Sequence, residues 1–194
     1  MSARRALIAA AALALAGAAS AADPEAGRQK AGVCTACHGE DGNSINPAWP
    51  SLAAQPAQFI STSLFMFREG DRKDPLMTPM AAKLSNTDLS DLAAYFAAQK
   101  AAPPVHKTSQ ENAAAGPGLA KKFNCTQCHG PRLLGQQHIP RLAGQQLDYL
   151  RTQLRGFKAN TRADIDGNMS SAAQPLSEKD IDVLADYIAG LGAQ

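Results

Sequence analysis

The sequence CTACHG at residues 34–39 recurs, with one substitution, as CTQCHG at residues 125–130. Each copy holds two cysteines separated by two residues, with a histidine directly after the second, and this is the attachment pattern of c-type haem. On a helix the two thiols lie about one turn apart, so both reach the vinyl groups along one haem edge while the adjacent imidazole reaches the iron. The repeat therefore predicts two covalently bound haem c groups.

Each motif supplies two attachment cysteines and one proximal iron ligand. The cysteines are Cys34, Cys37, Cys125 and Cys128, and the ligands are His38 and His129. A zinc site would usually place its two cysteine pairs about 15 to 20 residues apart, but these pairs begin at positions 34 and 125. Disulfides or a thioredoxin-like pair leave the histidine after both pairs unexplained. Haem attachment is the favoured interpretation.

The N-terminal residues have the pattern of a secretory signal. Arginines at positions 4 and 5 precede an apolar run over about residues 6–19, and small residues follow before Asp23. The run is shorter than the roughly 20 apolar residues of a membrane span. We therefore expect residues 1–22 to be removed on export to the periplasm, where the mature protein is free or peripherally associated with the membrane.

The charge of the mature chain argues against nucleic acid as a partner. The 194 residues include 19 Lys and Arg against 17 Asp and Glu, a formal charge of +2. Both signal arginines leave on export, so 17 residues of each sign remain. A neutral chain lacks the basic surface of a nucleic-acid-binding protein.

The haem motif is only one part of an internal repeat. PSLAAQ at residues 50–55 matches PRLAGQ at 140–145, and LSNTD at 84–88 matches LSEKD at 176–180. In the second pair each serine precedes an acid by three residues, as in a capping box that starts a helix. Apolar residues then recur at helical spacing, and Tyr95 corresponds to Tyr187. Each half therefore forms one module that ends in an amphipathic helix.

No alternating strand pattern of useful length occurs, so we expect an all-α fold. Asp23 can cap a first helix that has Pro24 in its first turn. Further helices are expected over about Pro56 to Arg68, Gln145 to Phe157, and Gly118 to Phe123.

The segment AAPPV at residues 101–105 breaks the helical pattern, because proline lacks an amide donor and restricts its predecessor. We expect two domains, 23–100 and 112–194, joined by a linker over 101–111.

A methionine in each half is the candidate sixth iron ligand. Met169 is the only methionine of the second half, and it lies seven residues before Leu176. Met77 lies seven residues before the equivalent Leu84, so the shared register selects Met77, with Met80 as the alternative.

The remaining candidates are interpreted as structural. Met66 falls in an apolar helical stretch and reads as core. His106 in the linker and His138 in the loop before Pro140 are expected to be exposed rather than ligands.

Together these features resemble the dihaem cytochrome c4 family: paired Cys-His-Gly modules, the Pro-x-Leu-Ala-x-Gln segment, a methionine before Leu-Ser-x-x-Asp, and a final helix with tyrosine. The resemblance covers essentially the whole mature chain. It implies two class I cytochrome c domains related by a pseudo-twofold axis, with haems close enough to exchange electrons.

The resemblance also implies the ligands. His38 pairs with Met77 and His129 with Met169, while the carbonyls of Pro50 and Pro140 accept hydrogen bonds from the two imidazoles. The loop before Met169 is two residues longer than its counterpart.

Such ligation predicts an electron carrier rather than an enzyme. Methionine raises the reduction potential relative to bis-histidine sites, and a six-coordinate iron offers no place to a small-molecule substrate. The resemblance implies redox protein partners: a quinol-oxidising complex such as bc1 as donor and a terminal oxidase, often of the cbb3 type, as acceptor.

Two other functions are also considered for a chain with two haem motifs. One is a dihaem cytochrome subunit of a periplasmic dehydrogenase such as flavocytochrome c sulfide dehydrogenase. The other is a dihaem peroxidase, which needs an open iron position; the matched methionines and the short chain argue against it.

Overall fold

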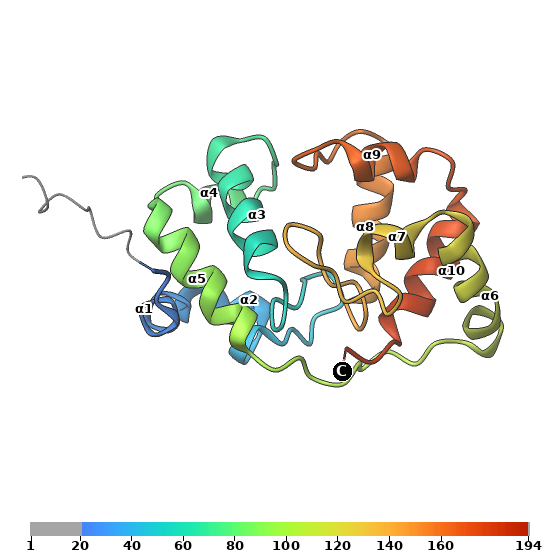
Figure 1. Ribbon diagram of the computed structural model, residues 1–194, viewed down its shortest axis with the longest axis horizontal. Helices are drawn as coiled ribbons and strands as arrows, with labels where there is room; N and C mark the ends of the chain where they lie inside the picture. Colours follow the sequence, from blue (N-terminus) through green and yellow to red (C-terminus); the bar gives the residue numbers. More distant parts are fainter. Residues whose placement is uncertain (1–20, 194) are drawn as a thin grey trace, which may run out of the picture.

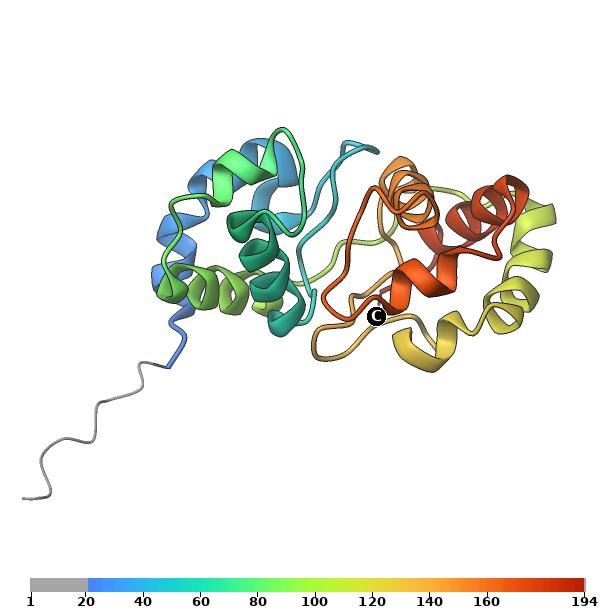
Figure 2. The same cartoon turned by 90° about the horizontal axis from the view of Figure 1, so that it is seen from above.

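The computed structural model describes residues 21–193, which fold into two groups of helices lying side by side (Figures 1 and 2). Almost all of the expected signal, residues 1–22, lies outside the described residues. The first domain contains α1 (Pro24–Lys30), α2 (Gly32–His38), the short 3-10 helix η1 (Glu40–Gly42), α3 (Ala57–Glu69), α4 (Met77–Ala81) and α5 (Asn86–Ala98). The second contains α6 (Gln110–Lys122), α7 (Cys125–His129), α8 (Leu147–Lys158), α9 (Asn168–Ala173) and α10 (Glu178–Ala189).

The predicted all-α class is confirmed. Residues 21–193 form no β-strand, only an isolated bridge between Gln136 and Ile139. Within the same residues, no helix is long and apolar enough to cross a membrane.

The helix starts follow the sequence signals. The side chain of Asp23 accepts hydrogen bonds from the backbone of Glu25 and Ala26 at the start of α1. Ser85 and Ser177 form complete capping boxes at α5 and α10, each with the acid three residues later. Each box satisfies backbone donors that a helix otherwise leaves unpaired. The two middle helices, α3 and α8, also lie within two residues of their predicted bounds.

Helix α6 starts earlier than the sequence suggested. It begins at Gln110, after the capping residue Ser109, so the last two residues of the expected linker are helical and the predicted start near Gly118 is wrong. Pro117 lies inside this helix despite the usual cost of proline there. Packing against α10 decides the outcome, because it stabilises the helix on both sides of the proline.

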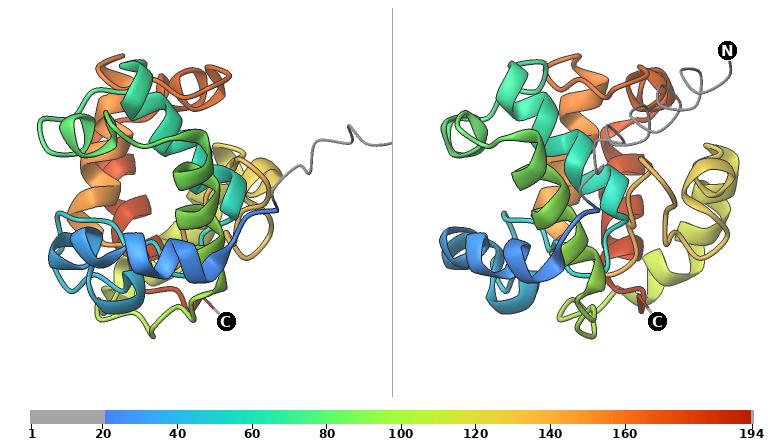
Figure 3. Two further views of the ribbon diagram at one scale, coloured as in Figure 1. Left: turned by 90° about the vertical axis from the view of Figure 1, so that its left-hand side faces the viewer. Right: turned by 60° about the vertical axis from the view of Figure 1, so that its left-hand side comes forward.

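Each domain builds its core where its first helix and its middle helix pack against its last helix. Figure 3 shows α1 crossing α5 in the first domain, and α6 packs on α10 in the second. The first core contains Ile60, Leu92, Tyr95 and Phe96. The second is larger and contains Leu133, Leu150, Phe157, Ile181, Leu184 and Ile188.

A glycine in each domain sets the closeness of this packing. A Cβ on Gly27 would lie 2.0 Å from the carbonyl oxygen of Asp91, and one on Gly116 would lie 2.2 Å from Cγ of Tyr187. Both positions therefore require glycine because the final helix occupies the space of a side chain.

We expect Gly116→Ala to lower the free energy of unfolding of the holoprotein by about 1–3 kcal/mol, as overpacked cores do. Gly118→Ala is the matched control on the same helix, since a Cβ there meets nothing within 4 Å; it should be neutral or stabilising by up to about 1 kcal/mol. Denaturation in guanidinium chloride measures both, and equal effects of the two substitutions would contradict the packing argument.

Candidate functional site

The two Cys-x-x-Cys-His motifs form helices α2 and α7, one in each domain (Figure 1). Cys34 and Cys125 are half-buried, Cys37 and Cys128 are exposed, and none of the four is in a disulfide. Burial raises the pKa of the Cys34 and Cys125 thiols. No group of three or more His, Cys, Asp or Glu side chains placed to hold a metal ion occurs within residues 21–193.

The two motif histidines are buried and oriented by proline carbonyls. His38 is 7% exposed and His129 is 3% exposed. Nδ1 of His38 lies 2.8 Å from the carbonyl oxygen of Pro50, and Nδ1 of His129 lies 2.8 Å from that of Pro140. The expected role of both prolines is confirmed.

This contact fixes the proton on each ring. A carbonyl oxygen only accepts, so Nδ1 must carry the hydrogen and Nε2 keeps its lone pair. Burial lowers the pKa of both imidazoles, outweighing the opposite effect of the carbonyl contact. The neutral ring is the form that binds a metal, so both residues fit an iron ligand.

The two candidate methionines occupy equivalent places. Met77 begins α4, and its backbone N–H donates to Oδ1 of Asp74 at 2.9 Å; Met169 lies at the start of α9, and its N–H donates to Oδ2 of Asp164 at 2.9 Å. The additional two residues of the second loop lie between the aspartate and the methionine.

The other methionines differ from this pair. Met80 lies further along α4 and is 49% exposed, whereas Met66 is 5% exposed in α3, consistent with its expected core role. The equivalence of the aspartate contacts supports Met77 over Met80.

A cluster of cations at the domain interface was not foreseen from the sequence. Arg72 stacks on Phe67 at 4.4 Å and Arg162 on Phe157 at 4.3 Å, so the two arginines correspond under the repeat. Nη2 of Arg72 also donates to the hydroxyl of Tyr149 in the other domain at 3.1 Å.

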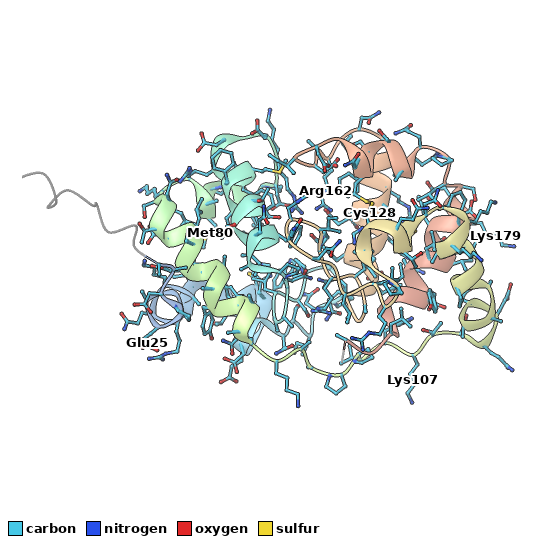
Figure 4. All side chains as sticks on the ribbon, viewed as in Figure 1. Glu25, Met80, Lys107, Cys128, Arg162 and Lys179 are labelled. Atoms are coloured by element: carbon cyan, nitrogen blue, oxygen red, sulfur yellow. The ribbon has the colours of Figure 1, made fainter. Side chains whose placement is uncertain are left out.

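Arg162 gives an independent test of whether the chain fits haem. Figure 4 places it between the two domains. Burial lowers its pKa to about 9, and its buried Nε has no hydrogen-bond partner among the described residues. A buried cation with an unsatisfied donor favours a nearby anion, and haem carries two carboxylates. The residues present therefore fit this cofactor.

The two remaining histidines are not simply exposed, as the sequence had suggested. His106 is partly buried, with Nε2 2.5 Å from Oδ1 of Asp186, and Nε2 of His138 lies 3.2 Å from Oδ2 of Asp166. Asp186 also accepts from the backbone N–H of Ser109, so it holds the end of the linker against α10.

Comparison with known proteins identifies the family. The Cytochrome c family model matches residues 24–100 and 113–192. Cytochrome c4 from Thiocapsa roseopersicina is 40% identical over 181 residues, which cover 87% of this chain and 93% of the relative. The chain belongs to the cytochrome c4 family.

A solved structure and a second relative support the same family. The crystal structure of reduced recombinant cytochrome c4 from Pseudomonas stutzeri superposes with a TM-score of 0.82 at 37% identity, covering 88% of this chain and 100% of the other. A thiosulfate dehydrogenase electron acceptor from Stutzerimonas stutzeri is 33% identical, over 82% of this chain and 79% of its own. As a cytochrome c4 family member, the chain binds two covalent haem c groups and carries electrons.

We expect Cys128→Ser to leave two haems per chain but to hold one of them by a single thioether. Its unreacted vinyl group stays conjugated with the porphyrin, so half of the pyridine haemochrome absorption should move to longer wavelength. Cys37→Ser is the matched variant in the other domain and should give the same spectrum, with the altered haem on a different tryptic peptide by mass spectrometry. An unshifted spectrum in either variant would remove that cysteine from the attachment set.

Proposed function

We propose that this cytochrome c4 family member carries electrons in the periplasm from a quinol-oxidising membrane complex to a terminal oxidase. Cys34 and Cys37 attach the first haem and Cys125 and Cys128 the second. The axial ligands are His38 with Met77, and His129 with Met169. The observation that carries the proposal is the matched placement of a neutral, buried histidine and a partly buried methionine in each domain.

The haem supplies an iron that gains and loses one electron, and the chain keeps its ligands fixed. Pro50 and Pro140 hold the two imidazoles from the backbone, which restricts rotation of the rings. Asp74 and Asp164 fix the backbone at the two methionines. Side chains held in this way need little rearrangement when the charge on the iron changes, which favours electron transfer. Two protein ligands at each iron leave no position for peroxide, which argues against peroxidase activity.

The periplasmic location rests on the N-terminal sequence. The paired arginines and the apolar run that follows are typical of an export signal. Covalent attachment through two cysteines also suits an exported protein, because the haem cannot be lost by dilution.

A second candidate function is that of electron acceptor for a periplasmic dehydrogenase. The similarity to a thiosulfate dehydrogenase electron acceptor favours it. The same two haem domains serve either donor, since only the docking surface must differ. In the related alternative, the chain is itself the dihaem cytochrome subunit of a periplasmic dehydrogenase such as flavocytochrome c sulfide dehydrogenase.

Met77→Ala should abolish the far-red methionine-to-iron absorption of one haem and lower that haem's potential, within the roughly 0.8 V that axial ligands span. Loss of a soft ligand destabilises the reduced iron, and Met169→Ala should do the same to the other haem. Met80→Ala is the control and should leave spectrum and potentials unchanged. A far-red band lost in Met80→Ala and kept in Met77→Ala would exchange the two assignments.

The donor is tested by stopped-flow spectroscopy of the oxidised holoprotein. Membranes with an active quinol-oxidising complex and added quinol should reduce both haems, and an inhibitor of the complex should prevent it. Absence of reduction, with rapid reduction by a purified periplasmic dehydrogenase and its substrate, would replace the first function by the second.

A further inference from the structure

The two Pro-x-Leu-Ala-x-Gln segments meet at the domain interface and exchange reciprocal hydrogen bonds. Gln145 accepts from the backbone N–H of Ser51 at 2.7 Å and donates to its carbonyl oxygen at 2.9 Å. Gln55 accepts from the N–H of Arg141 at 2.9 Å and donates to its carbonyl oxygen at 3.0 Å. All four residues are buried. Each glutamine thus clamps the equivalent backbone position of the opposite domain, as in an isologous twofold contact.

Each clamped N–H belongs to the same peptide group that orients a motif histidine. The carbonyl of Pro50 and the N–H of Ser51 form one peptide unit, which accepts from Nδ1 of His38 and donates to Oε1 of Gln145. The Pro140 carbonyl and the Arg141 N–H form the corresponding unit between His129 and Gln55. One peptide group therefore joins each imidazole to a glutamine of the other domain.

Hydrogen bonds in such a chain strengthen one another. An acceptor at the N–H polarises the peptide and makes its carbonyl oxygen more negative, which strengthens the next hydrogen bond by about 10–30%. The more negative oxygen draws the Nδ1 proton of the histidine, which raises the basicity of Nε2 as a ligand. A more basic ligand stabilises oxidised iron relative to reduced iron. Burial increases the effect, because no water competes for these groups.

We propose that Gln145 and Gln55 are positioning residues that lower the reduction potential of the haem in the opposite domain. Gln145 acts on the haem of His38, and Gln55 acts on the haem of His129. The assembly of the two domains thereby adjusts both irons through the two peptide groups that join each glutamine to a histidine. This inference rests on the histidine ligation proposed above.

The chain offers a rescue variant and a close control. Glutamate at position 145 keeps an oxygen acceptor for the Ser51 N–H, although it loses the Nε2 donor to the Ser51 carbonyl. A carboxylate is the stronger acceptor, so Gln145→Glu should not raise the potential. Gln146 is buried beside Gln145, and its Nε2 donates across the same interface to the carbonyl of Ser44, which orients no histidine. Gln146→Leu therefore removes an interdomain hydrogen bond of the same kind, while it keeps the Gln146 backbone N–H that donates to Oε1 of Gln145.

The test is a redox titration of the holoproteins, with each haem assigned by the Met77→Ala and Met169→Ala variants. Gln145→Leu should raise the potential of the first-domain haem alone and shift the electron-exchange equilibrium between the haems by roughly threefold. Gln55→Leu should shift the second-domain haem alone and the equilibrium in the opposite direction. Gln146→Leu should leave both unchanged. Gln145→Leu and Gln55→Leu test the same mechanism in different domains. If one of them does not fold, the other still tests the proposal.

The pattern of shifts decides between tuning and simple structural support. Four results would each overturn the inference. The potential could shift only for the haem in the domain of the substituted glutamine, shift equally for both haems, or not shift at all. Gln146→Leu could also change the potentials as much as Gln145→Leu does. Failure of the ligand assignment would show separately. In that case the Met77→Ala and Met169→Ala variants would keep the far-red band of the wild-type protein.

Discussion

The hydrogen bond from a buried imidazole to a proline carbonyl is the contact on which the rest of this structure depends. It selects the tautomer that leaves Nε2 of His38 and His129 available, and it ties the orientation of each ring to the backbone rather than to another mobile side chain. The histidines lie at the ends of the short helices α2 and α7, and the proline carbonyls of the PxLAxQ segments orient their rings. Because the same segments form the domain interface, ligand orientation and domain assembly share one piece of backbone.

The interface is therefore more than a joint between two independent cytochrome domains. Its core is reciprocal, with Gln55 and Gln145 each pairing with backbone of the other half. Backbone pairing tolerates different side chains at the clamped positions, which explains how Ser51 and Arg141 can correspond in a repeat that has otherwise diverged. The two corresponding arginines both interact with Tyr149: Arg72 donates to its hydroxyl, and Arg162 lies beside it with an Nε that finds no partner within residues 21–193.

Local signals in the sequence predicted most of the elements and identified the candidate site residues. The cysteine and histidine spacing, the capping serines and the position of Pro24 act over three or four residues, so they can be read without knowing the fold. The register of Met77 and Met169 was also readable, because the repeat supplies its own internal alignment. The start of α6 was misjudged for the opposite reason: Pro117 is a strong local signal, but the packing of Gly116 against Tyr187 comes from a helix far along the chain.

The sequence by itself determined the cofactor chemistry, the helical class and the duplication, since each is encoded by spacing within one short segment or by similarity between two. Only the tertiary structure decided which groups meet across the interface and between the linker and α10. The glutamine clamps, the Arg72 contact with Tyr149 and the pairing of His106 with Asp186 each join residues more than seventy positions apart. Contacts of that kind depend on how segments far apart in the sequence are placed against one another, and no pattern along a single chain records the distance between them.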